Sequence, residues 1–136
     1  MKKIKLHTTL ELLREKGACE FGYKKLLKNL GTKWSDDKPI NLLRVLKSNG
    51  VQDMLWCIRA TTEPYKNHWE FLCGMYADFA ESVLPVYEKQ FPNDPRPRNA
   101  IEYARTGKGA AGAAGAARAA ESKKQATIIR KYLAKD

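Results

Sequence analysis

A long amphipathic segment between Trp69 and Phe91 is the clearest pattern of apolar and polar positions in the chain. At 100° per residue, its large apolar side chains form one broad stripe: Phe71, Leu72, Met75, Tyr76, Phe79, Val83, Val86 and Tyr87. The opposite face holds Glu70, Gly74, Asp78, Glu81, Pro85 and Glu88. Because a stripe this wide needs cover from at least two neighbouring helices, we expect the central helix of an all-α domain, bent at Pro85.

Shorter helical patterns flank this segment, and no stretch shows a strand pattern. Thr8 and Glu11 match a capping box for a first helix, which Gly17 would end. Further helices are expected over about 18–30, 39–47, 51–60 and 98–106, and the long helix is expected to open at residues 61–64. The sequence therefore predicts a single helical domain over residues 1–136, built from about six to seven helices.

Two stretches near the end of the chain need separate treatment. Residues 92–98 read Pro-Asn-Asp-Pro-Arg-Pro-Arg, and these prolines predict a stiff corner after the long helix, with Asp94 accepting backbone N–H bonds of the next helix. The Gly/Ala-rich residues 107–117 could be helical or form a flexible link. Since alanine favours helix and the stretch runs into a clear amphipathic end, we favour a last helix over about 110–133.

Composition places the protein among ordinary globular chains with a strong basic bias. The net charge is +10, and residues 1–33 and 95–136 carry most of the excess Lys and Arg. The three cysteines are odd in number, lack CxxC spacing and are expected to be buried free thiols in a reducing compartment. No apolar run reaches the roughly 20 residues of a membrane span. We expect a soluble, intracellular protein.

Few residues in the sequence are candidates for catalysis. No phosphate loop, dinucleotide-binding, nucleophile-elbow or zinc-protease motif occurs, and His68 and Cys73 lack a second ligand pair, so we predict no metal, no cofactor and no enzyme activity. Asp78 and Glu81 share a helical face, either as an acid–base pair or as solubility charges. Asp53 is either a ligand-facing carboxylate or a first-turn helix acid.

Several residues and motifs resemble those of a family of small helical proteins from phage and prophage genomes, labelled Imm-5-like or immunity protein. They are residues 17–22, residues 53–56, Cys73 with Ala77 and Ala80, residues 84–88, residues 92–102, and the Ala-rich tail before a terminal amphipathic helix. The resemblance implies an all-α fold and a phage- or prophage-encoded, cytoplasmic protein of the bacterial cytosol. It implies no catalytic residues.

Two functions remain open. The first is a non-enzymatic immunity or anti-defence protein that occludes a host or phage protein, with candidate contacts Asp53, Glu70, Asp78, Glu81, Glu88, Arg96 and Arg98. Arg96 and Arg98 have a structural alternative, in which they tie the corner to Glu88 or Glu102. The second is a nucleic-acid-binding accessory protein that contacts phosphates through Lys24, Lys25, Lys28, Lys123, Lys124, Arg130 and Lys131.

Overall fold

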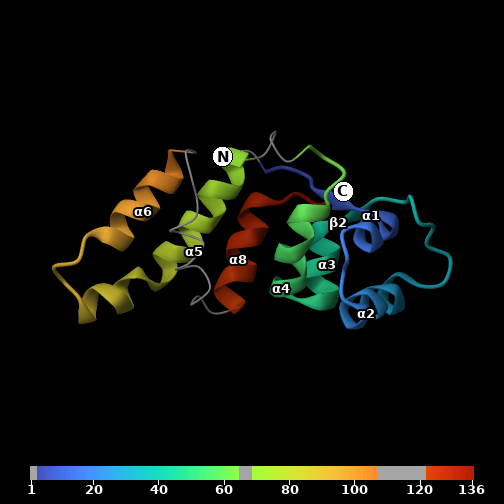
Figure 1. Ribbon diagram of the computed structural model, residues 1–136, viewed down its shortest axis with the longest axis horizontal. Helices are drawn as coiled ribbons and strands as arrows, with labels where there is room; N and C mark the ends of the chain where they lie inside the picture. Colours follow the sequence, from blue (N-terminus) through green and yellow to red (C-terminus); the bar gives the residue numbers. More distant parts are fainter. Residues whose placement is uncertain (1–2, 65–68, 107–121) are drawn as a thin grey trace. The chain divides into compact units, whose positions relative to one another are not determined.

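The computed structural model describes residues 3–64, 69–106 and 122–136 (Figure 1). The described chain is mostly helical, which confirms the predicted all-α fold class. Its contacts divide it into two compact units, the first made of Met1–Asn67 with Leu133–Asp136 and the second of His68–Tyr132. The prediction of one domain over residues 1–136 is not tested by this division and stays a prediction. Each unit is described by itself.

The first unit contains the helices α1 (Leu10–Glu15), α2 (Glu20–Leu30), α3 (Leu42–Asn49) and α4 (Val51–Trp56), and α4 continues as a 3-10 turn, η1 (Cys57–Ala60). Gly31 and Gly50 have φ of 89° and 92°. This left-handed backbone suits glycine, and both residues end a helix where the sequence predicted a stop. The predicted helices over 18–30 and 51–60 are thus confirmed to within two residues at each end.

The start of α1 differs from the predicted capping box. Thr9, not Thr8, is the N-cap residue, and its hydroxyl accepts the Leu12 N–H at 3.1 Å. Thr8 is fully buried in a strand. The prediction was therefore wrong by one residue, since Thr8 and Thr9 both precede an apolar helix and only the strand pairing of Thr8 distinguishes them.

A small sheet corrects two predictions. Strand β1 (His7–Thr8) pairs antiparallel with β2 (Ile40–Asn41), although no strand was expected. The helix predicted from Pro39 begins only at Leu42, because Ile40 is buried in β2 and the Asn41 side chain caps α3 by accepting the Leu43 N–H at 2.9 Å. Strands of two residues are too short to show an alternating pattern.

The core of the first unit gathers side chains from every one of its elements. The Ala134 N–H donates to the Ile4 carbonyl at 2.7 Å, so the last residues of the chain join this unit. The buried apolar residues are Leu6, Leu10, Leu13, Leu26, Ile40, Leu42, Val45, Leu46, Val51, Met54, Cys57, Ile58, Ala60 and Leu133.

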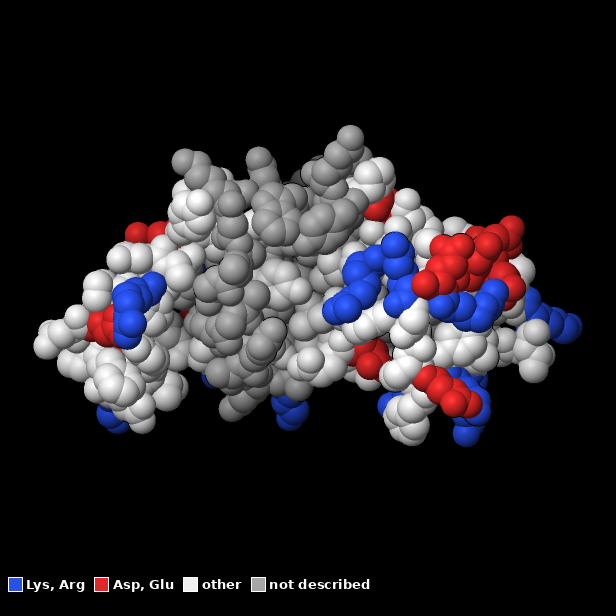
Figure 2. Space-filling model, in the orientation of Figure 1, with Lys and Arg blue, Asp and Glu red and all other residues white. Residues whose placement is uncertain are grey.

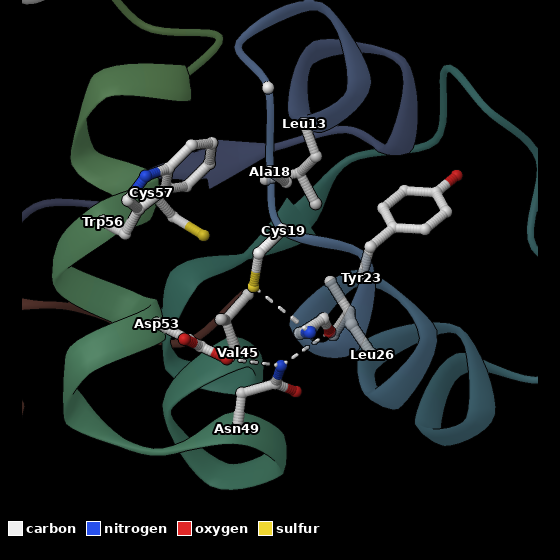
Figure 3. Close-up of a pocket in the computed structure, with 12 residues that line it drawn as sticks. Leu13, Ala18, Cys19, Tyr23, Leu26, Val45, Asn49, Asp53, Trp56 and Cys57 are labelled. Carbon is white, nitrogen blue, oxygen red and sulfur yellow. Dashed lines mark hydrogen bonds between the residues drawn. The ribbon is translucent and has the colours of Figure 1, made fainter.

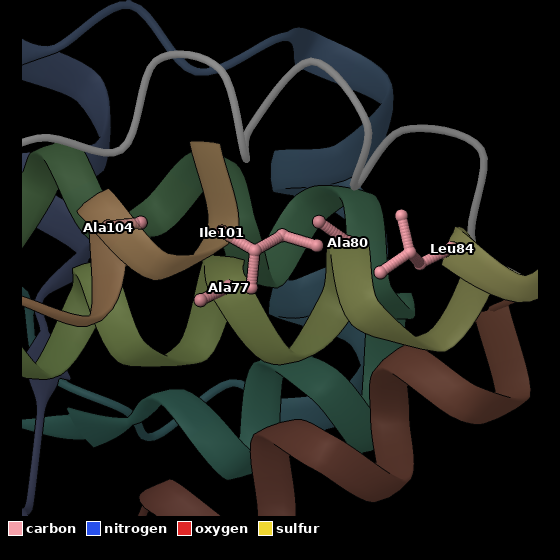
Figure 4. Packing of buried hydrophobic residues seen from close by; sticks show 5 residues of the cluster. All are labelled: Ala77, Ala80, Leu84, Ile101 and Ala104. Atoms are coloured by element: carbon pink, nitrogen blue, oxygen red, sulfur yellow. The ribbon is translucent and has the colours of Figure 1, made fainter. Parts of the chain in front are cut away.

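The second unit contains α5 (Trp69–Gln90), α6 (Arg96–Arg105) and α8 (Ser122–Tyr132). Both α6 and α8 pack on α5, so α5 is the central helix of its unit, with Pro85 inside it as predicted. Figure 4 shows Ala77, Ala80 and Leu84 of α5 against Ile101 and Ala104 of α6. The small alanine side chains let the two helices approach closely.

The buried face of α5 follows the predicted stripe only in part: Leu72, Met75 and Phe79 are buried as predicted. Ala77 and Ala80 are buried, whereas Val86, which the stripe included, is 68% exposed. Gly74 was placed on the solvent face but lies against Tyr132 of α8. The stripe was drawn through the largest side chains, and these helices meet at the smallest ones.

Three further predictions concern the ends of helices. Thr61–Pro64, expected to open the long helix, are not helical. The terminal helix is confirmed for Ser122–Tyr132, but Leu133 follows it in extended backbone. Residues 107–117, predicted to be helical or a link, lie outside the described residues. None of the helices described here is both long and apolar enough to cross a membrane.

Candidate functional site

Two of the quoted sequence motifs meet in the first unit, around a pocket of about 170 Å³ (Figure 3). Residues 17–22 approach it from the start of α2, and Asp53 and Trp56 approach it from α4. The remaining lining residues are Tyr23, Leu13, Leu26, Val45, Asn49 and Cys57. The two motifs are about thirty positions apart in sequence, and the fold makes them opposite walls of one cavity.

Asn49 organises the polar side of this pocket. Its side-chain nitrogen donates to the Gly22 carbonyl at 2.8 Å and to Oδ2 of Asp53 at 2.9 Å. The turn at Gly50 allows this geometry, since it ends α3 directly after Asn49 and starts α4 just before Asp53. Asn49 therefore ties α2 to α4 and holds the half-buried Asp53 carboxylate beside Gly22.

Gly22 leaves no room for a larger residue at this point. A Cβ there would lie 2.9 Å from Oδ2 of Asp53 and 3.3 Å from Sγ of Cys19. The Gly22 N–H also donates to that sulfur at 3.4 Å, which makes Cys19 the N-cap of α2. Asp53 thus lines the pocket and also lies in the first turn of α4. A ligand contact by Asp53 stays a prediction.

The two thiols at the pocket differ in exposure. Cys57 is buried, and burial, together with the negative charge of Asp53, raises the pKa of Cys57 to about 12. Its thiol is therefore protonated at neutral pH and is a poor nucleophile. Cys19 is exposed, which corrects the expectation that all three cysteines are buried. Its position at the N-cap explains this, because a cap residue lies outside the apolar face of its helix.

A second concave surface lies between α5 and α6 in the second unit. This groove has a volume of about 580 Å³ and is lined mainly by apolar side chains. The lining residues are Ala80, Val83, Leu84, Val86, Tyr87, Gln90, Arg96, Pro97, Ala100 and Ile101. Val86 and, just beyond it, Phe91 are 68% and 52% exposed, so an apolar edge faces solvent beside the groove.

The proline corner closes one end of this groove through a dense polar network. Asp94 accepts the Arg96 N–H at 3.1 Å, two guanidinium bonds from Arg96, and the Tyr87 hydroxyl at 2.6 Å. These bonds hold the pKa of Asp94 well below its usual range, with the Arg96 side chain the largest cause. The predicted acceptance of a backbone N–H by Asp94 is confirmed.

The second arginine of the corner ties α6 back to α5. Arg98 makes a two-pronged ion pair with Glu88, at 2.6 and 3.0 Å. This is the structural alternative that the sequence left open for the corner arginines, whereas Arg96 pairs with Asp94 instead of Glu88 or Glu102. Both arginines and Glu88 remain partly exposed, so they also border any partner that covers the groove.

Asp78 and Glu81 are not plain solvated charges. Arg105 of α6 donates to both carboxylates, and the Tyr132 hydroxyl of α8 donates to Asp78 at 2.5 Å. The hydrogen bond to Asp78 and burial raise the pKa of Tyr132, burial being the larger cause. This cluster joins α5, α6 and α8, the helices that the structure describes in the second unit. An acid–base pair is not favoured by this arrangement, because both carboxylates are engaged in ion pairs with Arg105.

The remaining candidates are dispersed. Glu70 lies outside the residues whose side chains the structure describes. Lys24, Lys25 and Lys28 are exposed on α2, where Lys24 pairs with Glu20 at 2.6 Å, and Lys123, Lys124, Arg130 and Lys131 are exposed on α8. On the face shown in Figure 2, described Lys and Arg side chains lie beside Asp and Glu side chains. Nucleic-acid binding by these residues stays a prediction.

Sequence reasoning missed the exposed apolar residues and Asn49. Val86 looked like core because of its spacing, and Phe91, Tyr103 and Phe21 are 52%, 56% and 81% exposed. Asn49 carried one signal, its place directly before Gly50, but this signal predicts a helix end and gives no hint of Asp53 as its partner. Tertiary packing decides both cases.

Across the described residues, no group of three or more His, Cys, Asp or Glu side chains could hold a metal ion. The described part of the chain is thus mostly helical, and its concave surfaces include a mainly apolar pocket with one polar wall and an apolar groove. Residues 70–132, slightly less than half of the chain, match a family model described as "Imm-5 like putative immunity protein". This match confirms the family resemblance, and it coincides with the second unit. No curated protein and no solved structure matches the chain.

Proposed function

We propose that the protein is a non-catalytic, immunity-type binding protein that neutralises a partner protein by covering part of its surface. The family match supports an immunity-type function. The finer proposal, that of a phage- or prophage-encoded anti-defence inhibitor acting by occlusion, follows the resemblance of the sequence motifs. Immunity by occlusion needs a rigid face that presents apolar side chains to the partner.

The α5–α6 groove is the face that meets this requirement best. Isolated exposed apolar residues are common, but Val86 and Phe91 lie next to an apolar groove whose walls are fixed by helix packing. The ion pairs of Arg96 and Arg98 already hold the corner in place, so little conformational entropy is lost when a partner binds. The exposed Val86 beside this groove is the observation that carries the proposal.

The face fits a protein partner with a projecting apolar side chain surrounded by polar groups of both signs. The groove interior offers apolar contact, and its lining includes Arg96, which is paired with Asp94. The pair of Arg98 and Glu88 follows directly in sequence after the lining residues Pro97 and Tyr87. An apolar core with a polar rim is the usual anatomy of protein interfaces. Each of these arginines is already paired with a carboxylate, so this face does not favour a polyanion.

The test compares one substitution on this face with one elsewhere. Tagged wild-type protein is used to isolate a partner from the producing cell, and the dissociation constant is then measured with purified proteins. Val86→Asp should weaken binding at least tenfold, because a carboxylate would have to be desolvated against the groove. Phe21→Asp is the matched control, since Phe21 is even more exposed but lies on α2 of the first unit.

Activity provides the second readout. The partner should be toxic or restrictive when expressed alone, and wild-type protein and Phe21→Asp should relieve the effect while Val86→Asp should not. If Val86→Asp keeps its melting temperature and binds as tightly as wild type, the α5–α6 groove is not the interface. A partner whose activity is unchanged in the complex would contradict neutralisation.

A further inference from the structure

The pocket of the first unit contains a carboxylate that lacks a cationic partner. Among the described residues, Asn49 Nδ2 is the one side-chain donor to Asp53, and none of the ion pairs includes Asp53. Arg59, close by in sequence, stacks on the Trp56 ring at 5.1 Å and donates to the Trp56 carbonyl. Other acids of the first unit do have a cationic partner: Glu20, Asp36, Glu63 and Asp136 pair with a lysine, an arginine or a histidine.

The surroundings of Asp53 make this unusual. The carboxylate is half-buried and lies at the wall of a cavity whose other walls are mainly apolar: Leu13, Leu26, Val45 and Trp56. A carboxylate in apolar surroundings is stabilised by a cation or by strong hydrogen-bond donors. The carboxylate also lies close enough to the buried Cys57 thiol to contribute, after burial, to its raised pKa.

The volume limits what can enter. The cavity of about 170 Å³ is similar in size to cavities of ~150 Å³ that accept a benzene molecule, which has six heavy atoms. A ligand of this size with one cationic end and an apolar stem matches both kinds of wall. A dianion or a large nucleotide fits neither the charge nor the volume.

We propose that this pocket binds a primary ammonium group on a short alkyl stem, with the ammonium at Asp53 and the stem along Leu13, Leu26 and Trp56. Asn49 fixes the carboxylate for this contact, and the lack of a side chain at Gly22 lets the carboxylate lie close against α2. The same chemistry is found in free small amines and in the lysine side chain of another protein. The site lies outside residues 70–132, so it is independent of the proposed partner-binding face.

The first test uses wild-type protein and two probes of equal size. The titrations of n-pentylammonium and 1-pentanol are followed by NMR through the Trp56 indole N–H and the Asn49 side-chain amide. The ammonium should bind roughly tenfold more tightly than the alcohol, because its hydrogen bond to the carboxylate is charge-assisted. Equal binding of both probes, or no shift with either, would overturn the proposal.

The second test uses variants. Asp53→Asn preserves shape and should reduce the preference for ammonium over alcohol to about one, whereas Asp37→Asn, an exposed acid of the same unit, should preserve it. A preference that survives in folded Asp53→Asn would also overturn the proposal. If Asp53→Asn does not fold, the comparison of the two probes on wild-type protein decides.

A third titration distinguishes the two sources of the group. A capped Gly-Lys-Gly peptide presents a lysine side chain on a polypeptide backbone, and the corresponding peptide with norleucine is its neutral control. Binding of the lysine peptide at the same two reporters would assign the pocket to a partner's lysine. Binding of pentylammonium without the peptide would assign it to a free amine.

Discussion

The Asp94 carboxylate shows how a polar side chain of the second unit finds its hydrogen-bond partners within that unit. Asp94 accepts four hydrogen bonds from Tyr87 and Arg96, and the four-bond arrangement exists only with a charged carboxylate. The pKa of Asp94 is lowered from 3.8, above all by the Arg96 guanidinium. A carboxylate whose pKa is lower in the folded state stabilises the fold above the unfolded pKa, and that contribution is lost as pH falls through the folded pKa.

We therefore predict that Asp94→Asn lowers the melting temperature by a few degrees at pH 7, and that the difference from wild type shrinks as the pH falls below about 4. The amide keeps the size of the side chain but cannot accept bonds at both ends. Thermal unfolding followed by circular dichroism between pH 2.5 and 7 measures the effect.

Glu102→Gln is the control for this substitution, because it removes an exposed carboxylate from the same region of the chain, on α6. It should leave the melting temperature nearly unchanged at pH 7. If Asp94→Asn melts with wild type at every pH, the corner network makes no contribution to stability.

At the scale of elements, glycine stop signals proved reliable, whereas helix-start signals and packing signals did not. Glycines with φ near 90° end α2 and α3 where the sequence placed stops, since a left-handed residue is a local property. The strand pair was missed because two residues per strand show no period. The exposure of Val86 was missed because periodicity gives the face of a helix but not how far a neighbour covers it.

The candidate site shows the same division. The motifs containing Cys19 and Asp53 were noticed from the sequence, but their meeting in one pocket was not predictable without the fold. Asp78, Glu81 and Glu88 were recognised as one polar face of α5. Their partners Arg105 and Arg98 lie on α6, and only the angle between the helices brings them into reach.

Two helical glycines predict opposite outcomes for the same substitution. In Gly74→Ala the new Cβ would lie 3.5 Å from the Tyr132 hydroxyl, an ordinary contact, so the helix preference of alanine should stabilise the fold by up to about 1 kcal/mol. In Gly22→Ala the new Cβ would lie 2.9 Å from Asp53 Oδ2. This close contact should destabilise the fold by about 1 kcal/mol or more. Urea unfolding of both variants measures the difference.

Gly74→Leu provides a check on this reasoning. Its side chain would have to displace Tyr132 from Asp78, so it should reverse the gain of Gly74→Ala. Stabilisation by Gly22→Ala would mean that the Asp53 carboxylate moves aside freely, and the close contact at α2 would then have no energetic consequence.

At the scale of the whole chain, the first unit is assembled from both ends of the sequence. The Ile4 carbonyl accepts the Ala134 N–H, and the Asn41 side chain donates to the Ala134 carbonyl at 2.9 Å. His7 adds a polar cluster, since its ring contacts Asp136 through Nε2 and Glu63 through Nδ1, the latter at 3.4 Å. Glu63 and Asp136 lie 56 and 129 positions from His7 in sequence, and both contact its imidazole.

This cluster predicts a pH-dependent stability of the first unit. Burial alone would lower the pKa of His7, but hydrogen bonds and charges of Asp136 and Glu63 outweigh it, and the pKa is raised above 6.5. The Asn41 side chain also donates to Asp136 at 3.3 Å, and the positive charge of Lys5 helps to lower the pKa of Asp136. A histidine with a raised folded pKa stabilises the fold fully below pH 6.5, and the contribution is lost as pH rises through the folded pKa. His7→Gln should therefore cost more stability at pH 6 than at pH 8.5.

Thermal unfolding of wild type and His7→Gln at pH 6, 7 and 8.5 measures this difference, and the imidazole Cε1–H shift of His7 gives its folded pKa directly. His68→Gln, which removes the other histidine of the chain, is the control for a general effect of imidazole titration. The melting-temperature gap between wild type and His7→Gln should narrow steadily with rising pH. A constant gap, or a folded pKa at or below 6.5, would show that Asp136 and Glu63 do not hold the imidazole in its charged form.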